Sequence, residues 1–295
     1  MASFIMSGKL QAILFVLLTA LASFWFPPFI LLSAAATSLI ALRKGWQAAL
    51  PIMGIGAIGL IALAQLMNGQ IQNELQTIFL QWLPLLFFAV LLTRTVSWQA
   101  VLQTMFMLAL AGVALMYMFI PDTEGFWQAQ LMTVMQPMVD SKQQTQQEAI
   151  NNAKLMAMWA SGAMMAGLTV FWLITLFMAR HWQAQLYEPD GFSVEFRALN
   201  AGKLPALIIV ALILFIVISQ SVVAINLLIA GMMVFLFHAL GLIHGLVRQL
   251  NMHGAWLIGI YVFLLLALQV ALVLLIAFAL IDSFANFRKK LKPKH

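Results

Sequence analysis

The sequence predicts an all-α fold: a polytopic transmembrane helix bundle of eight or nine spanning helices, formed by residues 1–295 as a single integral membrane domain. Hydrophobic residues make up 64% of the chain, charged residues make up only 8%, and the mean hydropathy is +1.00. A soluble domain could not cover so much apolar side-chain surface with so few charged groups. Lipid is therefore the solvent that we expect around most of the chain.

The acidic residues lie between the long apolar runs or at their edges, where an ionised carboxylate is least costly. They are Glu74, Asp122, Glu124, Asp140, Glu148, Glu188, Asp190, Glu195 and Asp282. This distribution predicts a membrane interior without carboxylates and argues against a carboxylate-based ion pump. The net charge of +6 comes from basic residues beside the apolar runs, so it indicates contact with anionic lipid headgroups rather than with nucleic acid.

Nine apolar segments follow one another along the chain, and most have the roughly 20 residues that a helix needs to cross a bilayer. The segments are 10–26, 29–42, 46–67, 75–93, 99–120, 155–179, 204–219, 222–247 and 255–281. Such unalternating runs exclude a β-barrel. Pro27 and Pro28 end the first segment. Only Gln220 and Ser221 separate segment 204–219 from segment 222–247. These two segments are therefore either two spans or one broken helix plus a span.

Basic residues at the segment ends predict the orientation, because short cytoplasmic loops are enriched in lysine and arginine. If nine helices alternate strictly, one side carries Lys9, Arg43, Lys44, Arg94, Arg180, Arg197, Lys203 and Arg248. We expect this side to face the cytoplasm of a bacterium, across its inner (cytoplasmic) membrane. Nine spans would place the basic tail 288–295 outside, against the same rule, so either one segment does not cross fully or the tail is an exception.

Two connections are long enough to have structure of their own. Residues 121–154 are rich in glutamine and are expected to form an extracytoplasmic loop, with an interfacial helix that lies against the bilayer or caps the bundle. Residues 180–203 are expected on the cytoplasmic side as an elbow, with a turn at Pro189-Asp190-Gly191.

The chemistry-bearing residues inside the membrane are few. One face on which another helix can pack is formed by residues that recur at helical spacing, namely Gly231, Val234, His238, Gly241, Gly245 and Arg248. His238 on this face has two interpretations: an interhelical hydrogen bond beside a packing seam, or contact with a ligand. The candidate ligand-binding residues are His238, Gly241, Gly245, Asn226 and Gln269. The amides of Gln65, Gln81, Gln103 and Gln269 would either line such a cavity or form hydrogen bonds between helices.

The elbow holds the densest pattern of aromatic and charged residues in the chain. Arg180 and Trp182 suit the headgroup level at a helix end, and Tyr187, Phe192 and Phe196 would fold back from the turn. The elbow is either a structural feature or a docking site for a protein partner. The candidate partner-binding residues are Arg180, Trp182, Tyr187, Phe192 and Glu195.

Enzyme signatures are missing from the sequence. There is no cysteine, which excludes thiol catalysis, thiolate metal sites and disulfides, and there is no metalloprotease helix, nucleophile elbow or Walker loop. We therefore expect no catalytic residues, no metal site and no cofactor.

Several short motifs resemble the YybS-like family of predicted bacterial membrane proteins. They are Arg180-x-Trp182-Gln183, Leu186-Tyr187-x-Pro189-x-Gly191-Phe192, Glu195-Phe196, Leu42-Arg43-Lys44-Gly45, the stretch from Gly241 to His244, and Asp282-Ser283 with Phe287-Arg288. The family has no assigned activity. Its distant similarity to the substrate-binding membrane subunits of energy-coupling-factor transporters implies a small-molecule cavity and an ATPase partner.

The first helix departs from those subunits at the contact that they use for docking. It lacks their Ala-x-x-x-Ala motif, because the residue four positions after Ala12 is Val16 and the residue four positions after Ala20 is Phe24. The leading hypothesis is therefore a protein that binds or transports a small hydrophobic or neutral ligand within the bundle. The alternative is a membrane scaffold or assembly factor that binds a membrane or cytoplasmic protein through residues 180–197.

Overall fold

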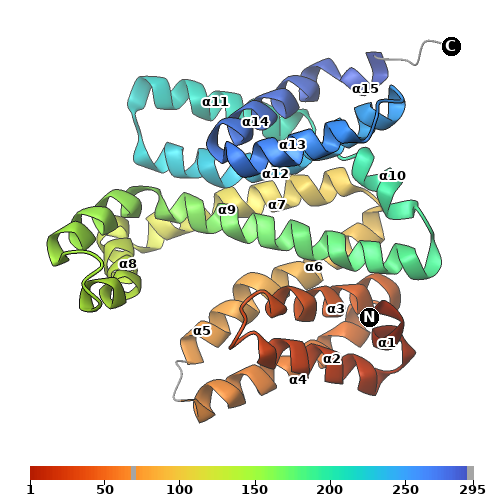
Figure 1. Cartoon of the computed structure of the whole chain (residues 1–295), viewed down its shortest axis with the longest axis horizontal. Coiled ribbons are helices and arrows are strands. Elements are labelled where there is room, and N and C mark those ends of the chain that lie inside the picture. Colours follow the sequence, from red (N-terminus) through yellow and green to blue (C-terminus); the bar gives the residue numbers. More distant parts are fainter. Residues whose placement is uncertain (68–70, 291–295) are drawn as a thin grey trace. The chain divides into compact units, whose positions relative to one another are not determined.

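A computed structural model describes residues 1–67 and 71–290, and in this part of the chain every regular element is a helix (Figure 1). The last five residues of the predicted basic tail, 291–295, lie outside the described residues. The chain divides into two compact units. Unit 1 comprises residues 1–101 and 170–198, and unit 2 comprises 102–169 and the chain from Leu199 onwards.

Unit 1 is built from the N-terminal helices and the end of one long helix. Its elements are α1 (Ala2–Ser7), α2 (Lys9–Ala22), α3 (Phe29–Lys44), α4 (Trp46–Leu66), α5 (Ile71–Gln76), the π-helix η1 (Thr77–Trp82), α6 (Leu83–Thr95), the C-terminal part of α9 (Gln146–Tyr187) and α10 (Gly191–Arg197). Helices α2, α3 and α4 pack against one another, and α3 also packs against α6.

Small residues allow this close packing. The α3 face that contains Ser33, Thr37 and Ala41 is buried, and the Ser33 hydroxyl donates to the Val16 carbonyl of α2 at 3.0 Å. On α4, a Cβ at Gly56 would lie 2.9 Å from Val16 and 3.0 Å from Trp82. Side chains larger than these would separate the helices, which is the usual reason for small residues between membrane helices.

Unit 2 is built around α12 (Val222–Gln249), which packs against α11 (Lys203–Ser219) and α14 (Leu268–Ala285). Its other elements are most of α7 (Trp98–Phe119), α8 (Thr123–Asp140), the N-terminal part of α9, α13 (Ala255–Leu266) and α15 (Phe287–Lys290). Helix α8 lies in the segment where the sequence predicts an interfacial helix. Asp122 caps its N-terminus by accepting from the Gly125 amide at 2.9 Å.

The number of spans differs from the prediction. Among the described residues, six helices are long and apolar enough to cross a membrane: Trp46–Leu66, Glu74–Thr95, Trp98–Phe119, Gln146–Tyr187, Val222–Gln249 and Leu268–Ala285. Three shorter apolar helices accompany them, namely α2, α11 and α13. The fold is thus an all-α multi-pass bundle, and eight or nine full spans are not confirmed.

The sequence suggested one helix for the apolar segment 255–281, but the structure has two. The backbone of Ala267, at φ −133° and ψ 50°, breaks it into α13 and α14, which pack against each other (Figure 1). Neither glycine nor proline marks the break, so the sequence contains no local signal for it.

The break returns the chain to the end of unit 2 from which α13 started. Gln249, at the end of α12, donates to the Arg288 carbonyl at 2.9 Å, and Arg288 donates to the Leu199 carbonyl at 2.6 Å. The basic residues Lys203, Arg248 and Arg288 therefore belong to one end of unit 2. Burial lowers the pKa of the Arg288 guanidinium, and nearby Asp282 acts in the opposite direction.

Candidate functional site

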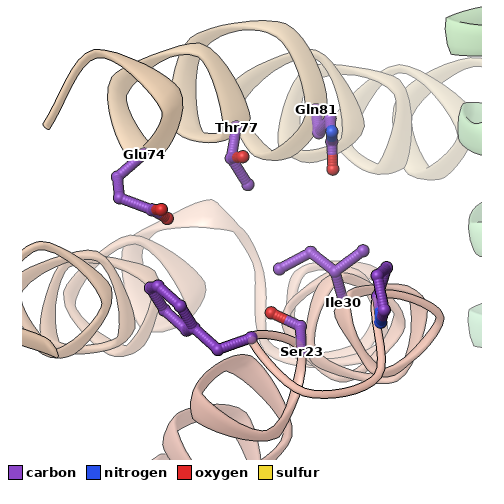
Figure 2. A pocket seen from close by; sticks show the side chains of 7 residues that line it. Ser23, Ile30, Glu74, Thr77 and Gln81 are labelled. Carbon is purple, nitrogen blue, oxygen red and sulfur yellow. The ribbon is translucent and has the colours of Figure 1, made fainter. Parts of the chain in front are cut away.

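A polar pocket of about 250 Å³ lies in unit 1 between the α2–α3 connection and the helix formed by α5 and η1 (Figure 2). Ser23, Phe24, Pro27, Ile30, Glu74, Thr77 and Gln81 line it. Glu74, Thr77 and Gln81 are spaced three and four residues apart, so they share one face of their helix. The connection that supplies Ser23 and Pro27 joins the ends of α2 and α3 opposite Lys9 and Lys44.

The pocket presents several hydrogen-bond acceptors. The Ser23 hydroxyl donates its proton to the Ala20 carbonyl at 2.6 Å, which leaves oxygen lone pairs for a ligand. The amide oxygen of Gln81 is buried and has no hydrogen-bond partner among the described residues. The carboxylate of Glu74 points toward the same space in Figure 2. Such a set favours a ligand that brings its own N–H or O–H donors.

A π-helical turn holds two of these residues, and proline explains why the α-helix is interrupted there. Pro84 has no amide proton, so it cannot donate to the carbonyl of Leu80 four residues earlier. Instead, the Trp172 indole of α9 donates to Leu80 at 2.8 Å. The turn over Thr77–Trp82 is fixed by this contact and by the buried Trp82 against Gly56. Single π-helical turns are frequent at functional sites.

His238 is buried in unit 2 and lies beside a carboxylate. Its Nε2 atom is 2.9 Å from Oδ2 of Asp282 on α14, and both side chains are at most 1% exposed. Oδ1 of Asp282 accepts from the Phe287 amide at 2.7 Å. Asp282 therefore links α12, α14 and the start of α15.

Asp282 lies in the last turn of α14 and Glu74 is the first residue of the candidate span Glu74–Thr95, so both carboxylates lie near helix ends, where the sequence places them. Asp282 and Glu74 both fall within helices long and apolar enough to span. Asp282 is tolerated because His238 and the Phe287 amide satisfy both of its oxygens.

The other residues of the predicted ligand site are dispersed. Asn226 is fully buried on α12, where its side chain accepts from the Gly162 amide at 2.7 Å and donates to Tyr117 and the Met158 carbonyl. Gly241 is buried, Gly245 is half-buried and Gln269 is exposed on α14. His238 does not line the pocket of Figure 2, and its side chain, like that of Asn226, links helices.

Of the four glutamines considered as cavity-lining residues, Gln81 lines a pocket. Gln103 instead donates to the Ala201 carbonyl at 3.1 Å, and Gln65 is exposed. Sequence reasoning missed Glu74, because it began the fourth segment at residue 75. The polar stripe Glu74, Thr77 and Gln81 was the signal that could have found the pocket.

Side chains of the predicted elbow contact other residues of unit 1. The turn at Pro189-Asp190-Gly191 reverses the chain, and Phe192 packs on Phe177 of α9 with ring centroids 5.7 Å apart. Trp182 lies edge-on to Phe15 at 6.4 Å, and Arg43 lies 4.2 Å from the ring centre of Tyr187.

The charged centre of the elbow is Glu195. Arg180 binds it through Nε at 3.1 Å and Nη2 at 2.5 Å, and the Trp98 indole donates to the same carboxylate at 2.8 Å. Arg180 also reaches Glu188 at 2.8 Å. These groups line a second pocket of about 340 Å³.

No group of three or more acidic, histidine or cysteine side chains suited to a metal ion occurs in residues 1–67 and 71–290. Comparisons of the chain with protein-family models, with curated proteins and with solved structures give no match.

Proposed function

We propose that this membrane protein binds a small cationic molecule in the pocket of Figure 2, as a step in its recognition or transport. The observation that carries this proposal is the acceptor-rich lining formed by Glu74, the unpartnered oxygen of Gln81 and the hydroxyl of Ser23. A volume of about 250 Å³ suits a molecule of a few non-hydrogen atoms.

The chemistry of the lining selects the charge of the ligand. Glu74 is the one charged side chain among the described lining residues. An ammonium group would neutralise its carboxylate and could also donate hydrogen bonds to the oxygens of Ser23 and Gln81. A neutral ligand, as the sequence suggested, would leave the charge of Glu74 without a counterion in the pocket. The proposed ligand is still a small molecule within a helix bundle, but it is cationic rather than neutral and lies near Glu74 rather than near His238.

We propose ten crossings in a bacterial inner membrane, with both ends of the chain in the cytoplasm. In the described residues, ten crossing segments are obtained when α2, α3, α11 and α13 are added to the six long helices. Alternation then places Lys9, Lys44, Arg94, Arg180, Lys203, Arg248 and Arg288 on one side, as the positive-inside rule requires. The pocket opens on the other side, toward solutes outside the cytoplasm.

Docking of a protein partner at the elbow stays a prediction, as does the resemblance to the YybS-like family. Arg180, Trp182 and Phe192 already make contacts inside unit 1, whereas Tyr187 and Val194 are 41% and 58% exposed. A partner would therefore contact the latter side chains first.

Ethanolamine and ethylene glycol provide a matched pair of probes, because an ammonium group in one replaces a hydroxyl in the other. We expect ethanolamine, and not ethylene glycol, to raise the melting temperature of the purified protein, by the mass action of a ligand that binds the folded state. Glu74→Gln should abolish the shift, and Glu124→Gln, which removes an exposed carboxylate elsewhere, should retain it. Equal shifts from both probes, or a shift that survives Glu74→Gln, would refute the proposal.

A further inference from the structure

An amphipathic groove of about 410 Å³ lies at the other end of unit 1, among α1, α2, α3 and α4. Its walls are aliphatic and include Ile13, Ile40, Ile52 and Ile55. Two cationic side chains, Lys9 and Lys44, and the amide of Gln47 also line it. The groove thus combines a long apolar surface with a positive charge, and it shares no residue with the pocket of Figure 2.

The two lysines lie at equivalent ends of neighbouring helices. Lys9 is the first residue of α2 and Lys44 is the last residue of α3, and both side chains are exposed. No acidic residue precedes Glu74 in the sequence, and none lines the groove. Their charges therefore attract an anion rather than a neighbouring carboxylate.

The surroundings place this charged end at the surface of a bilayer. Trp46 follows Lys44 closely and is 45% exposed, as is typical of indoles at the level of lipid headgroups. The aliphatic walls extend from there along the helices, on the side where hydrocarbon chains would lie. Basic pockets between membrane helices on the cytoplasmic side are a known arrangement for anionic lipid headgroups.

We propose that this groove binds an anionic phospholipid, with its phosphate between Lys9 and Lys44 and part of one acyl chain against the four isoleucines. The charge complementarity selects an anionic over a zwitterionic headgroup. The apolar walls select a lipid over a free phosphate ion.

Native mass spectrometry of the full-length protein in detergent tests the proposal with phosphatidylglycerol and phosphatidylcholine of identical acyl chains. We expect phosphatidylglycerol to be retained roughly 30-fold better, as two lysines near an anionic lipid surface imply. Lys9→Gln with Lys44→Gln should reduce this preference to near unity. Lys289→Gln with Lys290→Gln removes the same charge from exposed positions outside the groove and should leave the preference unchanged.

Two further measurements separate the lipid from other sources of negative charge. Ala48→Trp should fill the apolar part of the groove and reduce retention of phosphatidylglycerol while both lysines remain. Inorganic phosphate at a concentration equal to that of the lipid should not displace it. The proposal fails if wild-type protein retains both lipids equally, if the control pair loses as much as the Lys9 and Lys44 pair, or if phosphate competes fully. The wild-type comparison of the two lipids decides the question even if a variant does not fold.

Discussion

His238 and Asp282 are 44 residues apart in the sequence, yet their side chains meet at 2.9 Å in the buried interior of unit 2. The imidazole donates to a carboxylate whose second oxygen accepts from the Phe287 amide. Each side chain offsets the cost of burying the other, because a buried polar group without a hydrogen-bond partner destabilises the folded state. The pair fixes α12 beside α14 and thereby determines where the C-terminal segment of unit 2 lies.

Removing one member of this pair should lower the stability of the protein by more than the loss of a single hydrogen bond, because the remaining partner stays buried. We expect His238→Ala or Asp282→Ala alone to lower the free energy of unfolding by roughly 3–5 kcal/mol, since each leaves an uncompensated buried group. The double variant should lose less than the sum of the single losses, by about 0.5–3 kcal/mol. Thermal unfolding in detergent measures the cycle, and strict additivity would show that the two side chains are not coupled.

Gly162 tests how closely α9 and α12 approach. A Cβ at this position would lie 2.6 Å from the Asn226 carbonyl oxygen and 2.9 Å from its Cα, and backbone atoms cannot move aside as a side chain can. Gly162→Ala should therefore destabilise the protein by about 1–3 kcal/mol. A Cβ at Gly167 on the same helix would meet no atom of another described helix within 4 Å, so Gly167→Ala should be neutral or stabilising. Similar melting temperatures for the two variants would contradict the close contact.

The elbow depends on the forked geometry of one arginine. Arg180→Lys retains the charge but cannot bind Glu195 through two nitrogen atoms, so we expect a loss of about 1.5–3 kcal/mol. Arg197→Lys provides the control, because among residues 1–67 and 71–290 Arg197 has only a long contact of 3.5 Å to Ser193. Limited proteolysis between residues 188 and 198 should be faster in the Arg180 variant alone. Equal cleavage of both variants would contradict the stabilising role of the two-nitrogen contact from Arg180 to Glu195.

The absence of native cysteine makes the proposed topology directly measurable. A cysteine at Lys289 should react with a membrane-impermeant maleimide only after the cells are permeabilised. A cysteine at Lys142, in the predicted extracytoplasmic loop, should react in intact cells. Labelling of Lys289→Cys in intact cells would place the C-terminus outside and exclude ten crossings.

Local patterns were sufficient wherever a feature depends on neighbouring residues. The turn at Pro189-Asp190-Gly191 and the helix that begins after Asp122 follow from local backbone preferences and capping. The small side chains of Ser33 and Thr37 are buried, and their size allows α3 to pack closely on α2. The break at Ala267 could not be read, because no residue there disfavours a helix.

The sequence by itself determined that this chain is helical and requires lipid, since composition and the length of the apolar runs depend on no distant contact. Only the tertiary structure decided which polar residues meet. It joined His238 to Asp282, gathered Ser23 with Glu74 and Gln81, and used Asn226 to link helices instead of binding a ligand. These outcomes follow from helix packing across tens of residues of sequence, which determines whether a polar side chain lies in a pocket or finds a partner.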